Sequence, residues 1–434
     1  MTASRIMAAV RSGTWLTHER IIGYSIILLA YEGIAFLYFV ALANGLIDAT
    51  LAASGTDFTS FYAAGRLAQE GTPALAYDQA AHHAMERIIV GGPTAYNFFY
   101  YPPVFLLLCS LLAKLPYAAA LVLFEATTLA AFLWVGRRIL ADRKPIVVLA
   151  LLAFPPVWYN ALLGQNAFLT ASLFGMGFLL LDRRPILAGI VLGAICYKPH
   201  YGLLLPVAFI ASRNAKAFIA AAGSVAALVA LSLLQFGWVT WAAYFKAAAG
   251  SHVSYESGAV DMVSVATPFG ASLVLGLPSS QAYIVQGVVT ACVVAWVGLV
   301  WHRRDTSLAL RIASLLAAIP LTVPIFQYYD LAILVFAFAW LAQAPYTRGI
   351  MPFERTAIAC LYVASILTYA TNATPRFLVA PIIAAGAFLI TVARVRFERS
   401  LASLPEIGDQ HETGAMLPRG LSAGPHVAAE TPLR

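Results

Sequence analysis

The chain has 434 residues, of which 61% are hydrophobic and only 11% are charged, and its mean hydropathy is +0.79. Soluble domains carry about 25% charged residues, so this composition excludes an ordinary soluble domain. Apolar runs of helix-spanning length, separated by short polar segments, predict an all-α polytopic membrane protein. The net charge is +7, and the basic residues fall in short clusters between the runs, which favours membrane lipids as partners and not nucleic acid.

The apolar runs predict about 12 transmembrane helices. The expected spans are residues 21–43, 117–137, 145–163, 166–181, 185–199, 201–212, 216–237, 281–301, 307–323, 329–343, 354–370 and 377–394. Several of them are shorter than the roughly 20 residues that a perpendicular helix needs. We therefore expect some spans to be broken, tilted or enclosed by neighbouring helices.

The basic clusters orient these spans. Alternate connections carry Arg, Lys or His, as in Arg137–Lys144 and His302–Arg304. Placing these connections in the cytoplasm puts both termini inside and leaves residues about 44–100 and 238–280 as long external loops. Residues 1–20 are followed by an apolar run without a clear cleavage site, which indicates a cytoplasmic N-terminus and a retained first helix.

The segment Tyr101–Lys114, YPPVFLLLCSLLAK, is apolar enough to be a further span. Counting it as a span would place the four positive charges of Arg137–Lys144 outside, against the charge rule. We therefore predict a short re-entrant or interfacial helix there, with a full span as the alternative.

The two external loops contain the stretches FTSFYAAGRLA and WVTWAAYFKAAAG. Their mixture of aromatic and polar residues predicts amphipathic helices that lie flat on the membrane surface. Residues 21–398 then form the transmembrane domain. The polar, aperiodic residues 399–434 are expected to be a disordered cytoplasmic tail.

By this topology, the unusual polar residues gather at the outer face, where they could line one water-facing cleft. They are Asp57, Gln165, Asn166, Lys198, His200, Gln327, Tyr329, Asp330 and Arg376. Polar groups beside a bilayer are costly and often functional. Lysine, histidine and arginine can hold a phosphate, a partly desolvated carboxylate can remove a proton from a hydroxyl, and amides and tyrosines suit sugar hydroxyls.

Most of these residues also have a structural interpretation. His200 could be structural, and Tyr329 with Asp330 could be an interfacial aromatic and its hydrogen-bond partner. Asp57 is a favoured residue for capping a helix over Phe58–Ala68. Lys198 could extend to the lipid headgroups, and Gln165 with Asn166 could serve only a turn.

Four further ionisable residues lie outside this set. His82 and Glu86 have the i, i+4 spacing of metal ligands, but no other ligand is nearby, so no metal site is predicted. The pattern does not indicate a divalent metal, and it leaves open whether one assists. Glu32 and Glu125 lie inside apparent spans, where we expect polar partners in the helix bundle.

The pattern Asp57-Phe58-x-x-Phe61-x-x-Ala64-Gly65-Arg66-Leu67, followed by Tyr77-Asp78, resembles the first external loop of the family 87 glycosyltransferases. These polytopic enzymes of the C superfamily (GT-C fold) include bacterial polyprenyl-phosphate-mannose-dependent α-mannosyltransferases. Further matches are Tyr101-Pro102-Pro103, Gly164-Gln165-Asn166 and Lys198-Pro199-His200. Their order and spacing agree over roughly residues 20–345, and only the combination is specific.

The resemblance implies a glycosyltransferase of the bacterial inner membrane, with its active site facing outward. It would move a sugar from a polyprenyl-phosphate donor to a glycolipid or glycan acceptor with inversion. The acidic residue that opens the external loop, here Asp57, would be the general base, and Lys198 would neutralise the departing phosphate. Substrate contacts would come from Arg66, Tyr101, Gln165, Asn166, Gln327, Tyr329 and Asp330.

The sequence departs from the family pattern at one point. Family members often have a histidine before the Tyr-Asp pair that corresponds to Tyr329-Asp330, whereas this chain reads PIFQYYD. Either His200 or Arg376 supplies that charge, or the donor sugar is not mannose.

Two other functions fit the composition. A transporter or flippase for a lipid-linked or anionic substrate would use broken helices and polar groups near the midplane of the membrane. A membrane scaffold for envelope assembly would leave Asp57 and Lys198 without a reason to converge. No internal repeat is evident, which counts against an inverted-repeat transporter.

Overall fold

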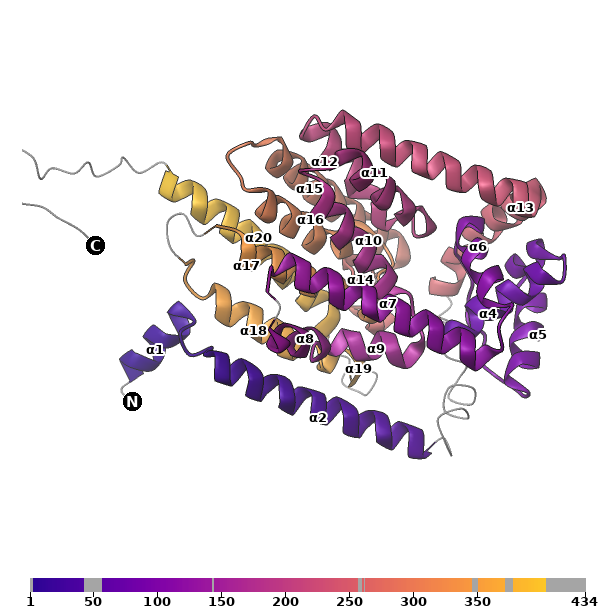
Figure 1. Cartoon of the computed structure of the whole chain (residues 1–434), viewed down its shortest axis with the longest axis horizontal. Helices are drawn as coiled ribbons and strands as arrows, with labels where there is room; N and C mark the ends of the chain where they lie inside the picture. Colours follow the sequence, from indigo (N-terminus) through magenta and orange to yellow (C-terminus); the bar gives the residue numbers. More distant parts are fainter. Residues whose placement is uncertain are drawn as a thin grey trace, which may run out of the picture.

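The computed structural model describes residues 3–42, 57–142, 144–256, 260, 262–345, 350–370 and 378–402. These residues form helices, with one isolated antiparallel bridge between Val265 and Gln327. The long helices α2 (His18–Leu42), α7 (Tyr117–Ile139) and α13 (Ala215–Glu256) run along the longest axis of the molecule (Figure 1).

The two ends of this long axis differ in what they contain. Helix α1 (Ala3–Ser12) and the C-terminal end of α20 (Val379–Ala402) lie at one end, on the left of Figure 1. Helices α4 (Asp57–Gln69), α5 (Gln79–Val90) and α6 (Pro103–Leu112) lie at the opposite end. Both ends of the described chain therefore lie far from the helices of the first expected external loop.

Five helices of the described chain are long and apolar enough to cross a membrane. They are His18–Tyr38, Tyr117–Ile139, Ala215–Glu256, Ser279–His302 (α15) and Val379–Ser400. A bent pair, α8 (Pro145–Leu152) and α9 (Pro155–Leu163), would make a sixth span if it crosses as one unit. The molecule is therefore a multi-pass membrane protein by the length and composition of its helices.

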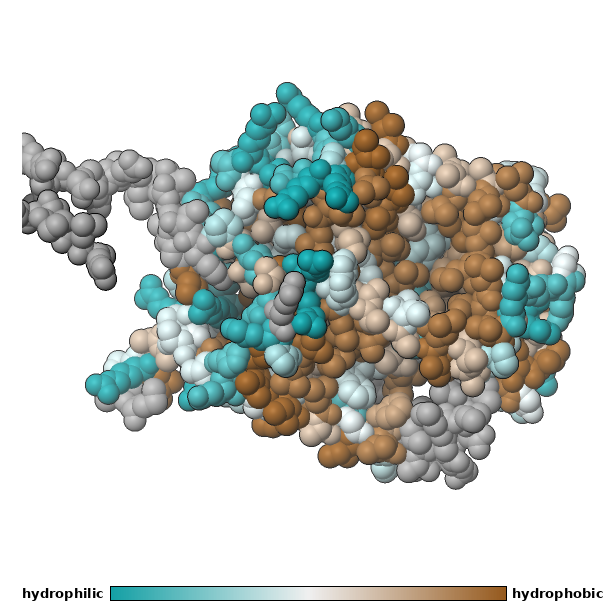
Figure 2. Space-filling view, viewed as in Figure 1, coloured by the Kyte–Doolittle hydropathy of each residue, from teal (hydrophilic) through white to brown (hydrophobic). Residues whose placement is uncertain are grey.

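The surface and the core of the molecule support this conclusion. Large apolar side chains such as Ile34 on α2 (67% exposed) and Leu234 on α13 (86% exposed) face outward, as lipid-facing residues do. Hydrophobic residues cover the middle of the face in Figure 2, and hydrophilic ones gather at the end where α1 and the C-terminal part of α20 lie. In contrast, α16 (Leu308–Thr322) is apolar on all sides and buried from Ile312 onward, so it forms part of the core.

The expected spans are all helical, but several are interrupted. The expected span 145–163 is two helices bent by 64°, because Pro155 and Pro156 lack the N–H groups that would continue α8. The expected end of span 216–237 coincides with a break at Gly237 (φ 75°, ψ 170°). Beyond this break the helix continues to Glu256, through the stretch WVTWAAYFKAAAG of the second external loop, which was predicted to be helical.

The first external loop does not match the expectation of a helix lying flat on the membrane. Nearly all of α4 is buried against α5, α6 and the 3₁₀ helix η1 (Pro73–Tyr77), and only its last turn has exposed side chains. Gly65 makes the contact with α6 possible, because a side chain there would clash with the carbonyl group of Cys109. Helix α6 has 10 residues, about 15 Å, which is too short for a straight span.

The remaining helices connect and cover these elements. They are α10 (Ala167–Leu180), α11 (Pro185–Gly193), η2 (Ala194–Tyr197), η3 (Tyr201–Leu203), α12 (Leu204–Ala211), η4 (Met262–Ser264), α14 (Pro268–Val274), η5 (Tyr328–Ile333), α17 (Leu334–Gln343), α18 (Glu354–Ala364) and α19 (Leu367–Ala370). Helix α20 continues to Ala402, beyond the expected start of the tail at 399. The rest of the expected tail, 403–434, lies outside the described residues.

Candidate active site

The structure contains a cavity of about 560 Å³. Six parts of the chain surround it: α4, the segment before α6, the α9–α10 turn, the η2–η3 connection, the end of α13 and the segment before η5. Eight of the sequence-predicted site residues line it. They are Asp57, Tyr101, Gln165, Lys198, His200, Gln327, Tyr329 and Asp330. Residues spread over more than 270 positions of the chain thus surround one space, as expected for a binding cleft.

Asp57, the first residue of α4, accepts a hydrogen bond from Gln165 (Nε2 to Oδ2, 2.6 Å). Gln165 reaches it because Gly164 ends α9 in the left-handed conformation (φ 66°). A side chain at Gly164 would also crowd Phe58, the neighbour of Asp57, at 2.7 Å. The glycine of the Gly164-Gln165-Asn166 motif therefore brings the amide to the carboxylate.

The electrostatic setting of Asp57 suits a base. Burial raises the pKa of Asp57 to about 6, while the Gln165 hydrogen bond and the Lys198 charge act in the opposite direction and Asp330 adds a smaller increase. At neutral pH the carboxylate is ionised yet more basic than an ordinary aspartate. A pKa near the working pH is what proton transfer from a hydroxyl requires.

Lys198 and Asp330 form the second pair of the cavity. Lys198 Nζ lies 2.8 Å from Asp330 Oδ1, and both side chains are buried, at 4% and 3% exposure. Tyr201 donates a hydrogen bond to the other carboxylate oxygen of Asp330 (2.6 Å), and its ring lies under the Lys198 ammonium at 4.9 Å. Lys198 therefore does not extend to the lipid headgroups; it is held in place and keeps further N–H groups for a ligand.

The segment before η5 is attached to the segment before α14. Gln327 bridges to Val265 by the backbone and accepts a hydrogen bond from Ser264 through its side chain (3.0 Å). Ala266 N–H donates to Phe326 O at 2.7 Å, which extends this connection by one residue. These contacts hold Tyr329 and Asp330 at the cavity.

His200 is exposed to the cavity on the side of Lys198. The surrounding protein, and then the Lys198 charge, lower the pKa of His200, which favours the neutral imidazole. In this form it can donate one hydrogen bond to a phosphate, and the positive charge that the sequence assigned to His200 stays a prediction.

Two predicted site residues, Asn166 and Arg66, do not line the cavity. Asn166 is fully buried, and its carbonyl oxygen accepts a hydrogen bond from Thr170 (3.0 Å) at the start of α10. Arg66 lies on the exposed end of α4 and pairs with Glu70 at 3.5 Å, because the opposite side of the helix is the one packed into the protein. Arg376 lies outside the described residues.

His82 and Glu86 lie behind the cavity wall, fully buried. His82 Nε2 contacts Ser60 O (3.0 Å), and Glu86 accepts a hydrogen bond from the backbone N–H of Asn97 (3.2 Å). Burial raises the pKa of Glu86 to about 8 and lowers the pKa of His82 to about 4. In the described part of the chain no group of three His, Cys, Asp or Glu side chains could hold a metal, so we interpret this pair as neutral and structural.

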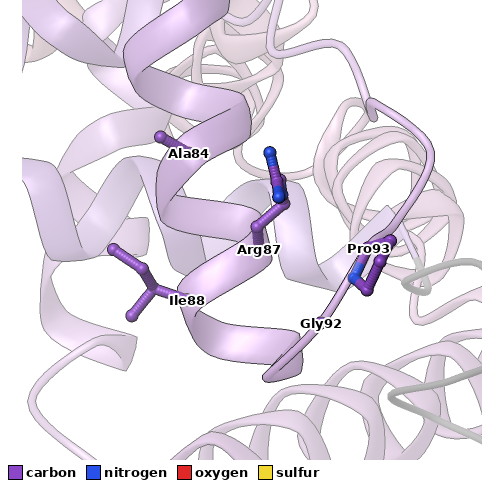
Figure 3. A pocket seen from close by; sticks show the side chains of 5 residues that line it. All are labelled: Ala84, Arg87, Ile88, Gly92 and Pro93. Atoms are coloured by element: carbon purple, nitrogen blue, oxygen red, sulfur yellow. The ribbon is translucent and has the colours of Figure 1, made fainter.

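A second, smaller hollow of about 330 Å³ lies at the C-terminal end of α5 (Figure 3). Its lining residues are Ala84, Arg87, Ile88, Gly92 and Pro93. It contains none of the predicted site residues and one charged side chain, so the larger cavity is the candidate active site.

Several cavity residues were missed by sequence reasoning. Tyr201 follows Lys198 by three positions, and the aromatic run YNFFYY at residues 96–101 precedes the Pro-Pro pair. Neither stretch stood out in the sequence, because aromatic residues are common at the interfaces of membrane proteins. The density of tyrosine beside a lysine or a Pro-Pro pair was the signal that could have identified them.

Comparison with protein families adds an independent finding. The sequence model of glycosyltransferase family 87 matches residues 99–326, more than half of the chain. This range includes four of the eight predicted residues that line the cavity, namely Tyr101, Gln165, Lys198 and His200. Gln327, Tyr329 and Asp330 follow directly after the matched range, and Asp57 precedes it. Searches of curated proteins and of solved structures found no match. The match shows that this chain belongs to glycosyltransferase family 87 and is a membrane glycosyltransferase.

Proposed function

We propose that this protein transfers a sugar, mannose or another hexose or pentose, from a polyprenyl-phosphate donor to a glycolipid or glycan acceptor, with inversion at the anomeric carbon. The observation that supports the proposal is one cavity lined by a basic carboxylate, Asp57, and a buried cation, Lys198. These are the two groups that such a transfer needs.

In the proposed reaction, an acceptor hydroxyl attacks the anomeric carbon on the face opposite the lipid phosphate. The bond from this carbon to the phosphate oxygen breaks, a bond to the acceptor oxygen forms, and the hydroxyl proton passes to Asp57. Lys198, held by Asp330 and Tyr201, stabilises the negative charge that grows on the leaving phosphate. His200 donates a neutral hydrogen bond to the same group.

Gln165 and Tyr101 line the cavity between these two charged groups in the proposed arrangement, where they bind the sugar hydroxyls. Gln327, Tyr329 and Asp330 contribute from the segment before η5, and Arg376 remains a candidate for the donor phosphate. A divalent metal has no assigned role in this scheme.

We further propose that residues 21–398 form one transmembrane domain of the GT-C type with about 12 crossings, some of them broken or short. The five long helices, the bent pair α8–α9 and five of the six shorter apolar helices supply eleven segments, with α6 left as the re-entrant or interfacial helix. Helices α18 and α19 cover the twelfth expected span, 354–370. The site would face the periplasm of a bacterial inner membrane, with both termini in the cytoplasm. Support comes from the common end at which α1 and the end of α20 lie and from the basic clusters.

This orientation is tested by cysteine labelling at Ala141, an exposed residue between α7 and α8. We expect an Ala141→Cys variant in intact cells to react only with a membrane-permeant maleimide. Reaction with an impermeant reagent would place this connection outside and reverse the proposed topology.

The transferase function is tested with purified protein in lipid nanodiscs, a panel of polyprenyl-phosphate sugars and alkyl glycoside acceptors. One donor should yield polyprenyl phosphate and a new glycoside in equal amounts, with the anomeric configuration inverted. A product with retained configuration would overturn the role of Asp57 as a base, since retention needs a different arrangement of groups.

A transporter is the second candidate, because the 64° bend between α8 and α9 is the kind of broken helix that transporters use. Sealed proteoliposomes separate the two functions. Accumulation of the lipid-linked sugar across the membrane without any covalent product would favour transport.

A further inference from the structure

The cavity has a second side that the proposed chemistry does not use. It is lined by five aromatic residues, which we call the aromatic wall: Tyr96, Phe98, Tyr100, Tyr244 and Tyr255. Tyr96, Phe98 and Tyr100 come from the segment before α6, and Tyr244 and Tyr255 come from α13 beyond its break at Gly237. All five side chains are half-buried, so each keeps part of its surface uncovered in the empty protein.

The aromatic wall is a built surface that joins two segments far apart in the sequence. The rings of Phe98 and Tyr100 are stacked at 5.4 Å, and Tyr255 meets Tyr100 edge-on at 6.4 Å. The Tyr100 hydroxyl bonds to Ser254 Oγ at 2.8 Å, which ties the segment to α13. Glu86 anchors the same segment from behind through the backbone of Asn97.

The chemistry of the aromatic wall differs from that of the Asp57–Lys198 side. Its five residues are one phenylalanine and four tyrosines, so it contains no carboxylate, ammonium, guanidinium or imidazole group. Asn97 and Ser251 add neutral polar groups to its lining. The surface therefore combines flat apolar rings with hydroxyl and amide groups at their edges.

Such a surface matches a neutral sugar ring better than other ligands. A pyranose has an apolar face of C–H bonds that packs on an aromatic ring, and hydroxyls around its edge that need hydrogen-bond partners. An isoprenoid chain could pack on the rings but offers no hydrogen-bonding group to the hydroxyls of Tyr96 and Tyr244, whose desolvation costs free energy. Among the described residues on this side, a phosphorylated or carboxylated ligand would find no cation.

We propose that the aromatic wall is the acceptor subsite and that it binds the terminal, uncharged sugar ring of the acceptor. This inference rests on the proposed transferase function. With the ring on the wall, one of its hydroxyls faces Asp57 across the cavity, and the donor phosphate occupies the Lys198 side. The acceptor is thus recognised as a saccharide, not as a peptide or an anionic lipid headgroup.

The experiment obstructs the wall without touching the catalytic groups. Ala248 lies on α13 among the cavity residues, and its neighbour Ala249 is exposed outside the cavity. Ala248→Trp fills the space in front of the wall, and Ala249→Trp adds the same side chain elsewhere on the same helix. Tyr255→Ala removes one ring, and Tyr255→Phe keeps the ring while removing its hydroxyl.

Two reactions are measured in nanodiscs with the donor that the wild type accepts. One is transfer to an octyl hexoside as the acceptor probe, and the other is slow hydrolysis of the donor by water. We expect Ala248→Trp and Tyr255→Ala to raise the KM for the octyl hexoside by about tenfold or more. Donor KM and donor hydrolysis should stay within about twofold of wild type, and Ala249→Trp should transfer nearly normally. Tyr255→Phe, which keeps the ring and loses only the hydroxyl, should raise the acceptor KM less than Tyr255→Ala does.

The other outcomes separate this inference from the proposed function. Wild-type acceptor KM in Ala248→Trp and Tyr255→Ala would overturn the acceptor subsite while leaving the transferase intact. A raised donor KM would assign the wall to the donor sugar or its lipid chain. A wild-type protein that neither transfers nor hydrolyses any donor would contradict the proposed function itself.

Discussion

Replacement of Asp57 by asparagine separates a catalytic role from a structural one. Asparagine has the same shape as aspartate, and its side-chain oxygen can still accept the hydrogen bond that Gln165 donates at 2.6 Å. The substitution therefore removes the negative charge and the basicity but keeps the contact between α4 and the α9–α10 turn.

The size of the effect follows from the role of the group. A positioned general base contributes about 10²- to 10⁴-fold to the rate, or about 3 to 5 kcal/mol of barrier. We expect Asp57→Asn to lose activity by this factor, with the loss in kcat and with donor KM little changed. The Lys198–Asp330 pair, which we assign to donor phosphate binding, is not altered by the substitution.

Although Asp57→Asn should lose activity, it should not lose folding stability at neutral pH. Burial raises the pKa of Asp57 from 3.8 to about 6, so the folded protein binds a proton more tightly than the unfolded chain does. That contribution to stability is complete below pH 3.8 and is lost as the pH rises through about 6. At pH 7.5 the buried charge therefore destabilises the fold, and Asp57→Asn should melt at the same temperature as wild type or higher.

The assay follows polyprenyl phosphate release and glycoside formation in nanodiscs between pH 5 and 9, together with thermal unfolding. Wild-type kcat/KM should rise with pH through about 6 and then level off, because the base must be ionised. Gln165→Met removes the hydrogen bond that lowers the pKa of Asp57. In this variant the rise of kcat/KM should therefore occur at higher pH than in the wild type. Glu70→Gln, an exposed change just beyond α4, is the matched control.

Two results would refute the reasoning. If Asp57→Asn retained more than about a tenth of wild-type turnover, a base contributing 10²-fold or more would be ruled out. If the variant were inactive but also melted well below wild type, Asp57 would be a structural residue such as a helix cap.

Two further predictions concern buried charges. Lys198→Met leaves the Asp330 carboxylate buried with only its Tyr201 hydrogen bond, so we expect about 3 to 5 kcal/mol of destabilisation and loss of transfer. Adding Asp330→Asn should recover most of the melting temperature but none of the activity; recovery of transfer would mean that Lys198 has only a structural role. Glu86, whose pKa is raised from 4.5 to about 8, stabilises the fold in its protonated form and loses that contribution as the pH rises through about 8. The melting temperature of the wild type should therefore fall between pH 6 and 9, and Glu86→Gln should remove this fall. If the variant showed the same fall as the wild type, groups other than Glu86 would be its cause.

How much the sequence could predict depends on the kind of interaction involved. Hydrophobic runs identified every long helix, because the bilayer imposes a length and a composition that a single segment reveals. The interruptions were less visible. The sequence shows Pro155, Pro156 and Gly237, but whether a proline or glycine breaks a helix depends on the residues that pack around it.

The external loop shows the same limit more clearly. The spacing of FTSFYAAGRLA predicted a helix correctly but suggested a position on the membrane surface, because aromatic and small residues suit either an interface or a protein core. The neighbours decide between these positions, and here α5, α6 and η1 enclose the helix. Arg66 is exposed for the same reason, since the buried side of α4 faces the other way.

The sequence by itself determined the membrane class, the family resemblance and the identity of Asp57 and Lys198 as candidate residues, because short motifs and apolar runs are local properties of the chain. Only the tertiary structure decided the partners of these residues. Gln165 lies 108 positions from Asp57, and Asp330 lies 132 positions from Lys198. Contacts at such separations are set by how helices pack, and so are the raised pKa of Asp57, the lowered pKa of His200 and the aromatic wall in the same cavity.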